Sequence, residues 1–413
     1  MNNFVDFNLI APDFVPDNKG PALEFFKWMR ENQPVHFNDI VEGYECPMEG
    51  ASMSQGFWVL SKYEDVQSAS RNTKVFSSGE QGPLLWDMEP HRLAEQQAGI
   101  MGKDDPEHAA LKRLVVPPFL PKNLAAYTPR IAEKVKKIVD DVASKGECEM
   151  VFDIASRLPV ATFCELMGIP NEDQEKIFNL GNALADVENQ DSDGAAELLE
   201  LFAYCDALSA KKRENPDDSM LSLYANGEFE GEKLPQEAVN MFFVTLSIAG
   251  HETTRNTLIH FFRLMNEYPE QYELLKSDVD KYLTGAINEV LRYCPPVMQF
   301  RRTCLEDVEV RGQQLKKGDK VFLSYVSANR DADVFENPDV FDITRTNSAR
   351  HLSFGTGPHT CLGARLAVTQ LSLLIKEIIN RIPDIRPKGE PEYLRSIWFH
   401  AIMSMPVEFT AEK

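Results

Sequence analysis

The sequence lacks the long apolar runs of a membrane protein. No stretch of about twenty residues is free of charged side chains, as a bilayer-crossing helix would require. Met1 to Asp6 contain neither a basic region nor an apolar segment, so no secretory leader is expected. Internal repeats, low-complexity linkers and a glycine-rich dinucleotide fingerprint are absent as well. These absences favour a soluble cytoplasmic protein with no membrane anchor and no dinucleotide-binding unit of its own.

Paired cysteines are also missing. The seven cysteines are dispersed and form no CxxC pair. An odd, scattered set in a chain without a leader argues for reduced thiols and against a disulfide framework. Cys46 is expected in a loop. The cysteines expected to be small apolar core residues are Cys148, Cys164, Cys205, Cys294 and Cys304.

Basic residues are outnumbered, since 43 Lys and Arg stand against 64 Asp and Glu, for a net charge of −21. A surface of this sign opposes binding to nucleic acid or to an anionic membrane. Hydrophobic residues make up 43% of the 413 residues, which is enough for a large core. We expect a single domain spanning 1–413, because nothing in the sequence divides it. Nothing indicates an obligate partner, so a monomer is expected.

The periodicity of apolar residues predicts a mainly α protein with a small β part. The β part is expected at about residues 30–75 and 297–330, with a tail at 385–410. Strands at 308–310 and 320–324 are predicted to form a hairpin through Gly312 and Gly318. Residues 76–105 are predicted to be a long loop containing a short helix. The longest predicted helix runs from Pro235 to Tyr268, and others are predicted at 63–71, 107–147, 158–167, 171–186, 194–214 and 269–294.

Cys361 lies in a glycine-rich loop, Phe354 to Gly363, directly before a predicted amphipathic helix. The unpaired N–H groups and partial positive charge of a helix N-terminus favour an anionic sulfur. Gly357 and Gly363 allow the backbone to bend and to lie close to a flat, bulky partner. Such a thiolate suits haem iron, where it favours O–O cleavage. Taken alone, the loop is equally compatible with a buried structural cysteine.

The segment Ala249 to Thr254 is unusual for the middle of a long helix. An interior glycine costs about 1 kcal/mol against alanine, and paired threonines add strain. We expect close approach to a ligand here, with a groove that suits dioxygen. A back-bonded threonine in a simple kink remains the alternative. His251 and Glu252 also begin a zinc-protease pattern, but position 255 is Arg where that pattern requires His, which excludes such a site.

The loop pattern of Phe, two residues, Gly, three residues, Cys, one residue and Gly resembles the haem loop of the cytochrome P450 family. Three more segments resemble motifs of that family in the same order: Ala249–Thr254, Glu289-x-x-Arg292 and Pro338–Arg345. The resemblance covers nearly the whole chain. It implies the cytochrome P450 fold, with haem b between the long central helix and the helix that follows the cysteine loop. Cys361 would be the iron ligand.

The resemblance also implies catalytic and structural roles. Thr253 would be the hydroxyl, and Glu252 the acid, of a pair that delivers protons for oxygen activation. Glu289 and Arg292 lie at i and i+3 on one helix face. With Arg345 they would form a buried bridge whose role is structural rather than catalytic.

Haem carries two propionates, so cationic or donating groups should converge on them. His108 and Lys112 resemble a family helix that supplies a histidine and, four residues later, an arginine. Lys112 departs from that pattern, since lysine lacks the bidentate fork, and its propionate contact stays open. Arg301 is expected to face solvent. The full cofactor-binding set implied by the resemblance is His108, Lys112, Ala249, Gly250, Arg302, Phe354, Gly355, His359, Cys361 and Gly363.

The substrate wall implied by the resemblance is aliphatic and aromatic and almost uncharged. Such a wall indicates a hydrophobic small molecule with few polar groups, such as a terpenoid, a steroid or a branched lipid. The expected wall residues are Leu84, Leu85, Trp86, Phe243, Leu246, Val297, Met298, Ile397 and Trp398. Each is equally compatible with plain core packing.

The resemblance as a whole implies a monooxygenase that inserts one oxygen atom from O2 into a C–H bond. Electrons would come from NAD(P)H through a separate reductase and an iron–sulfur ferredoxin. The docking surface would be a basic patch on the cysteine side, made of Lys112, Arg113, Lys122, Arg350 and Arg365. The alternatives are a peroxide-driven peroxygenase, a haem-binding sensor, and a cysteine-nucleophile hydrolase, for which no convincing base stands near Cys361.

Overall fold

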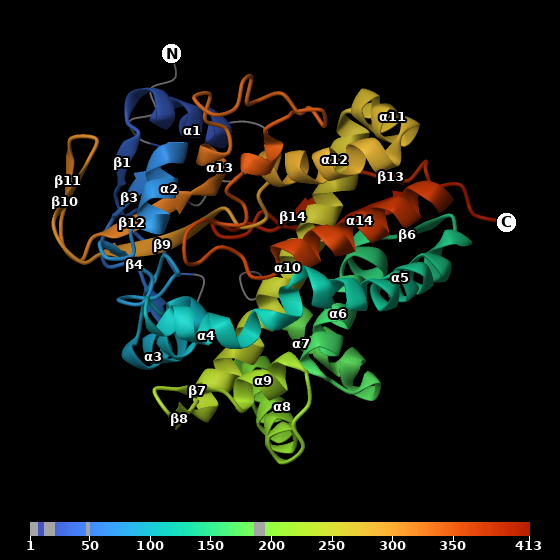
Figure 1. The fold of residues 1–413 in the computed structure, drawn as a ribbon. Coiled ribbons are helices and arrows are strands. Elements are labelled where there is room, and N and C mark those ends of the chain that lie inside the picture. Colours follow the sequence, from blue (N-terminus) through green and yellow to red (C-terminus); the bar gives the residue numbers. More distant parts are fainter. Residues whose placement is uncertain (1–6, 12–20, 47–49, 186–194) are drawn as a thin grey trace.

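The computed structural model describes residues 7–11, 21–46, 50–185 and 195–413. Helices dominate it, and a smaller sheet region packs at one side with α1, α2 and α13 (Figure 1). The predicted mainly α architecture is confirmed. The helices are α1 (Pro21–Asn32), α2 (Tyr63–Arg71), α3 (Pro90–Ala98), α4 (Glu107–Val115), α5 (Pro121–Ala143), α6 (Arg157–Met167), α7 (Gln174–Ala185), α8 (Ala195–Glu214), α9 (Met220–Ala225), α10 (Gln236–Glu267), α11 (Pro269–Ser277), α12 (Val279–Tyr293), α13 (Tyr325–Ala328) and α14 (Ala364–Arg381).

Helix α10 crosses the middle of the molecule (Figure 1) and packs against α6, α8, α12 and α14. Pro235 is its N-cap, where a missing N–H costs nothing, and Tyr268 is its C-cap before Pro269. The predicted bounds of this helix are therefore confirmed. Because α10 is surrounded by other elements, most of its side chains are buried, which makes its few exposed residues informative.

The main sheet is mixed and has the strand order β1-β3-β12-β9-β4. Its strands β3 (Phe57–Leu60) and β12 (Lys320–Ser324) pair in parallel, and β12 pairs antiparallel with β9 (Gln299–Cys304). All five residues of β12 are buried, as expected of a central strand. The edge strands are β1 (Val35–Asn38) and β4 (Phe76–Ser77). Successive side chains of a strand point to opposite faces of a sheet, so the neighbouring Arg301 and Arg302 of β9 lie on opposite faces.

Two predicted helices are each divided in the structure. The predicted helix 107–147 stops at Val115 and restarts at Pro121, because Pro117 and Pro118 cannot continue it. The predicted helix 269–294 consists of α11 and α12, and Asp278 separates them. The extended backbone of Asp278 lets its side chain accept a hydrogen bond from the Lys281 N–H, so Asp278 caps α12.

The predicted hairpin between 308–310 and 320–324 is wrong. Strand β10 (Val308–Val310) pairs instead with β11 (Gln313–Leu315). Arg311 and Gly312, with φ values of 50° and 80°, form the two-residue turn between them. Two positive φ values match the right-handed twist of the paired strands. Gly318 then turns the chain into β12.

The remaining strands form short two-stranded pairs and one three-stranded sheet. Val297 bridges to Phe399, which brings the tail next to the segment before β9. Among the helices of the described residues, none combines the length and apolar content needed to cross a bilayer. Cys164, Cys205, Cys294 and Cys304 are buried, and Cys148 is partly buried. The other strands are β2 (Ala51–Ser52), β5 (Asp87–Met88), β6 (Glu147–Glu149), β7 (Glu228–Phe229), β8 (Glu232–Lys233), β13 (Arg386–Pro387), β14 (Glu392–Tyr393), β15 (Ile402–Ser404) and β16 (Pro406–Glu408).

Candidate active site

The cysteine loop is shaped by glycines at positive φ. Gly355 and Gly357 have φ values of 66° and 74°, a region that L side chains rarely adopt. A Cβ added at Gly357 would lie 2.7 Å from the carbonyl oxygen of Ser70, so only glycine fits there. The N–H of Cys361 donates to the carbonyl of Phe354 at 2.7 Å, which closes the loop. The chain then enters α14 three residues later.

Cys361 lines a cavity of about 270 Å³ and is exposed where it does so. Desolvation by the surrounding protein raises the pKa of the thiol, whereas the Gly363 and Ala364 amides and the Lys112 ammonium act to lower it. The net direction is upward, contrary to the balance expected from the sequence. Across the described residues, no cluster of three or more His, Cys, Asp or Glu side chains offers a metal site.

Helix α10 contributes small residues to the same cavity. Ala249 and Gly250 are exposed although they lie in the middle of a largely buried helix. A Cβ at Gly250 would have no atom within 4 Å, so the space beside it is open. Both residues line the cavity together with Thr253 and Cys361. A flat group that approaches the sulfur can thus also approach the backbone of α10 closely.

The hydroxyl of Thr253 donates to the carbonyl of Ala249 at 2.8 Å, one turn back along α10. Thr253 is therefore back-bonded, which was the alternative to a ligand-binding role in the sequence analysis. It also lines the cavity. Glu252 is buried and does not line the cavity. Its carboxylate accepts hydrogen bonds from Arg255 at 2.5 Å and from Asn256 at 3.3 Å. The two residues proposed to act together therefore lie on different faces of the helix.

Four donor side chains, His108, Lys112, Arg302 and His359, line the cavity; we call them the cavity rim. The rings of His108 and His359 pack in a tilted arrangement with centroids 4.0 Å apart. Among the described residues, His108 Nδ1, Arg302 Nε and His359 Nε2 are buried without a hydrogen-bond partner. Burial, reinforced by neighbouring cations, lowers the pKa of His359 to about 2.

Lys112 differs from the other three rim residues because, within the described chain, none of its polar atoms is buried without a partner, whereas Arg302, which donates to the Arg301 carbonyl at 2.8 Å, still leaves its Nε unpaired. The Lys112 ammonium group donates to the carbonyls of Pro358 at 2.5 Å and Thr360 at 3.0 Å, both in the cysteine loop.

The expectation that Arg301 faces solvent is wrong, because its side chain is buried. Its guanidinium donates to the carbonyls of Leu85 and Trp86 and to Asp87, so the loop before α3 covers it.

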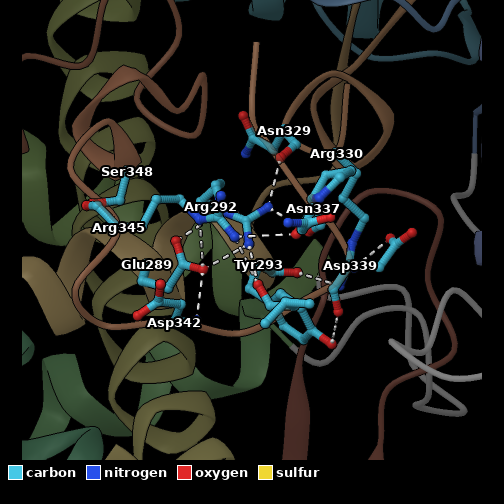
Figure 2. A network of polar contacts seen from close by, with 12 residues as sticks. Glu289, Arg292, Tyr293, Asn329, Arg330, Asn337, Asp339, Asp342, Arg345 and Ser348 are labelled. Atoms are coloured by element: carbon cyan, nitrogen blue, oxygen red, sulfur yellow. Dashed lines mark hydrogen bonds and ion pairs between the residues drawn. The ribbon is translucent and has the colours of Figure 1, made fainter. Parts of the chain in front are cut away.

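Glu289, Arg292 and Arg345 meet in the structure; we call them the Glu289 network (Figure 2). The Glu289 carboxylate accepts hydrogen bonds from Arg292 at 2.7 and 2.8 Å, from Arg345 at 3.1 Å and from the Asp342 N–H at 3.1 Å. The other N–H groups of both arginines donate hydrogen bonds to backbone carbonyls, including that of Val340. The network ties α12 to the segment that precedes the cysteine loop.

Of the expected substrate wall, only Leu246 and Val297 line the cavity. The others fill core instead, because neighbouring elements cover them. Trp86 donates to the Tyr44 hydroxyl at 2.8 Å, and Phe243 packs on Phe163. Trp398 stacks on Phe399. Leu84 does not line the cavity, and the remaining three pack in a cluster with α1: Leu85, Met298 and Ile397.

Several cavity residues escaped the sequence reasoning. Helix α6 presents one face to the cavity, and the lining residues on that face recur at helical spacing. The sequence contains this spacing, but a helix face packed in the core would show the same spacing. Ser78, whose hydroxyl is buried without a partner, is a polar addition near the rim. The apolar residues missed include Ile100, Met101, Phe119, Pro159, Phe163, Leu166, Met167, Met220, Phe242 and Phe300.

These features fit haem. Cys361 lines the same cavity as Gly250, beside which the space is open, and the rim supplies buried polar atoms that lack partners, as two carboxylates would require. The walls between are largely apolar. The Asp105 carboxylate lies 3.6 Å from His108 Nδ1, beyond hydrogen-bond distance, and so leaves that atom unpaired.

Comparison with known proteins gives the same assignment. The cytochrome P450 family model matches residues 177–383. A steroid C26-monooxygenase of Rhodococcus jostii is 34% identical over 98% of this chain and 84% of its own length. A methyl-branched lipid omega-hydroxylase of Mycobacterium tuberculosis is 33% identical over 93% of this chain and 90% of its own length.

Solved structures agree with the sequence relatives. A cytochrome P450 of Mycobacterium marinum in complex with pseudoionone has a TM-score of 0.86 at 33% identity, covering 94% of both chains. A second, from Bacillus megaterium in complex with testosterone, has a TM-score of 0.80 at 27% identity, covering 95% of this chain and all of the other. Matches of this extent show that the chain belongs to the cytochrome P450 family and is a haem b-dependent, hydroxylating monooxygenase.

Proposed function

We propose that this enzyme hydroxylates a C–H bond of a steroid, a terpenoid or a branched lipid. The observation that carries the proposal is the apolar cavity into which Cys361, Gly250 and Thr253 open together. The printed activities of the relatives, on steroids and methyl-branched lipids, support the substrate class. Substrate, O2, two electrons and two protons would yield the alcohol and water.

When bound, haem supplies the activation of dioxygen and the cleavage of the C–H bond. We propose that Cys361 ligates the iron. Arg302, His108 and His359 would hold the propionates, because their buried donors lack partners. Phe354, Gly355 and Gly363 would shape the loop against the porphyrin. Leu246 and Val297 would contact substrate.

Thr253 and Glu252 are proposed to supply protons. The Thr253 hydroxyl would break its hydrogen bond to the Ala249 carbonyl and turn towards the cavity. Glu252, which lies on the Arg255 side of α10, would then return a proton to the Thr253 hydroxyl. We expect Thr253→Ala to keep consuming reductant while the alcohol yield falls and hydrogen peroxide rises.

The matched control for Thr253 is Thr369→Ala, because Thr369 is back-bonded in the same way on α14 but does not line the cavity. Unchanged coupling of reductant to product in Thr253→Ala would reject the proton role. Turnover supported equally by peroxide alone would favour the peroxygenase alternative.

Electrons are proposed to arrive from NAD(P)H through a reductase and a ferredoxin that docks on the cysteine side. Arg113, Lys122, Arg350 and Arg365 are exposed there, whereas Lys112 is bonded to the loop. Arg113→Glu with Arg365→Glu should slow ferredoxin-driven turnover most at low salt, since screening weakens charge steering. Rates equal to wild type at every ionic strength would reject this docking surface.

The substrate class is tested by titrating steroids, terpenoids and branched lipids into the ferric holoprotein. A ligand that occupies the cavity should shift the Soret band, and the tightest class identifies the substrate. A panel that gives no shift, together with no ligand-stimulated reductant consumption, would favour the haem-sensor alternative.

A further inference from the structure

Lys112 lies in the last turn of α4 and reaches the cysteine loop. Its ammonium group has three N–H donors, and two of them bind the carbonyl oxygens of Pro358 and Thr360, at 2.5 and 3.0 Å. The Lys112 side chain is partly buried, as is its bond to Pro358, while its bond to Thr360 is exposed; a charged donor strengthens both bonds.

The contact with Thr360 controls the peptide immediately before the sulfur. The carbonyl of Thr360 and the N–H of Cys361 belong to one planar peptide unit. Its N–H donates to the Phe354 carbonyl at 2.7 Å, and its carbonyl accepts from Lys112. The plane is therefore held at both ends, which fixes the direction in which the Cys361 side chain leaves the backbone.

The ammonium group also brings a positive charge to the loop that carries the sulfur, because it binds the carbonyl oxygens of the residues one and three positions before Cys361. A lysine is well suited to this task, because a compact ammonium can bind two separate carbonyls. An arginine fork matches the two oxygens of one carboxylate better.

We propose that Lys112 is a positioning residue for Cys361, clamping the cysteine loop, and not a propionate ligand. The inference rests on Cys361 as the iron ligand. His108, Arg302 and His359 are left to hold the propionates. In this chain the lysine that replaces the expected arginine thus places its positive charge on the backbone of the cysteine loop and not on a propionate.

The test uses the haem-loaded protein and two readouts besides activity. Transfer of haem to excess apomyoglobin reports the propionate contacts. Persistence of the red-shifted Soret band of the reduced CO complex in mild urea reports the thiolate ligand. We expect Lys112→Met to lose that band about tenfold faster, as for other residues that orient a metal ligand. Haem transfer should be unchanged, and the midpoint potential should become more negative because a nearby cation is lost.

Lys112→Gln keeps one donor and should give an intermediate rate of band loss, which keeps the test valid should the Met variant load haem poorly. Arg302→Met should show the opposite pattern, with faster haem transfer and a persistent band. Exposed Lys122→Met should match wild type in both readouts.

Faster haem transfer with a persistent band in Lys112→Met would overturn the proposal in favour of a propionate contact. Wild-type behaviour in both readouts would overturn it in favour of a solvated cation. A wild-type holoprotein without the red-shifted band would instead refute Cys361 as ligand, and with it the proposed function.

Discussion

Two buried polar clusters in this protein are built in opposite ways. In the Glu289 network, the carboxylate accepts four hydrogen bonds, and both arginines spend their remaining donors on backbone carbonyls (Figure 2). In the cavity rim, His108, Arg302 and His359 each keep a buried polar atom without a partner in the described part of the chain. An unsatisfied buried donor is costly, so it persists where a ligand completes it. The first cluster is complete within the protein alone, and the second is the one that we propose to bind the propionates.

The largest expected effect is on the scaffold. Glu289→Gln would leave two buried guanidinium groups without their counter-charge, so we expect a loss of about 3–5 kcal/mol in the free energy of unfolding. Urea denaturation of the apoprotein measures it. The control is Asp280→Asn, which breaks an exposed pair with Lys376 and should cost less than about 1 kcal/mol. Equal losses in the two variants would remove the distinction between the clusters.

Arg302→Met tests the other side of the comparison. Because one Arg302 nitrogen has no partner in the apoprotein, its removal should leave apoprotein stability unchanged or raised. The holoprotein should release haem about ten- to a hundredfold faster, as expected from losing a charged hydrogen bond of ~1.5–3 kcal/mol. Comparing apoprotein denaturation with haem transfer separates the two. A variant that destabilises the apoprotein as much as Glu289→Gln would show that Arg302 is scaffold.

Unsatisfied polar atoms also occur away from the cavity, and they should make the protein sensitive to acid. His400 packs on His260 with ring centroids 4.3 Å apart, and burial beside Arg263 and Arg330 lowers the pKa of His400 to about 3. The folded state therefore stays neutral while the unfolded chain takes up a proton below its ordinary pKa of about 6.5. Stability should fall from pH 6.5 towards pH 3, by about 2 kcal/mol at pH 5 for this residue.

The measurement is apoprotein stability against pH for wild type and His400→Phe, with exposed His91→Asn as control. The His400 variant should show a shallower decline between pH 6.5 and pH 4, whereas the His91 variant should follow wild type. Parallel curves for all three proteins would show that the buried ring does not carry the acid sensitivity.

Features that depend on neighbouring residues in the chain could be predicted from the sequence. Features that depend on packing between distant segments could not. The Cys361 loop and the bounds of α10 follow from glycine, proline and cysteine spacing over a few residues, and the structure has the same loop and the same helix ends. The hairpin failed because Gly312 and Gly318 are equally good turn signals, and only strand pairing with β9 decides between them. The substrate wall failed for Trp86 and Phe243, because apolar side chains look alike whether they face core or cavity.

The smallest expected effect separates stability from function at one position, Gly250. A glycine within a helix costs about 1 kcal/mol against alanine, and a Cβ here would meet no atom within 4 Å. Gly250→Ala should therefore stabilise the apoprotein by up to ~1 kcal/mol. The added methyl group would occupy the open space beside α10 that faces Cys361, so coupling of reductant to product should fall in the holoprotein. Ala249→Gly is the reverse substitution one residue earlier, and should destabilise the apoprotein by a similar amount while leaving more room in the cavity. A Gly250→Ala variant that gained stability and kept full coupling would show that this glycine is not maintained for the ligand.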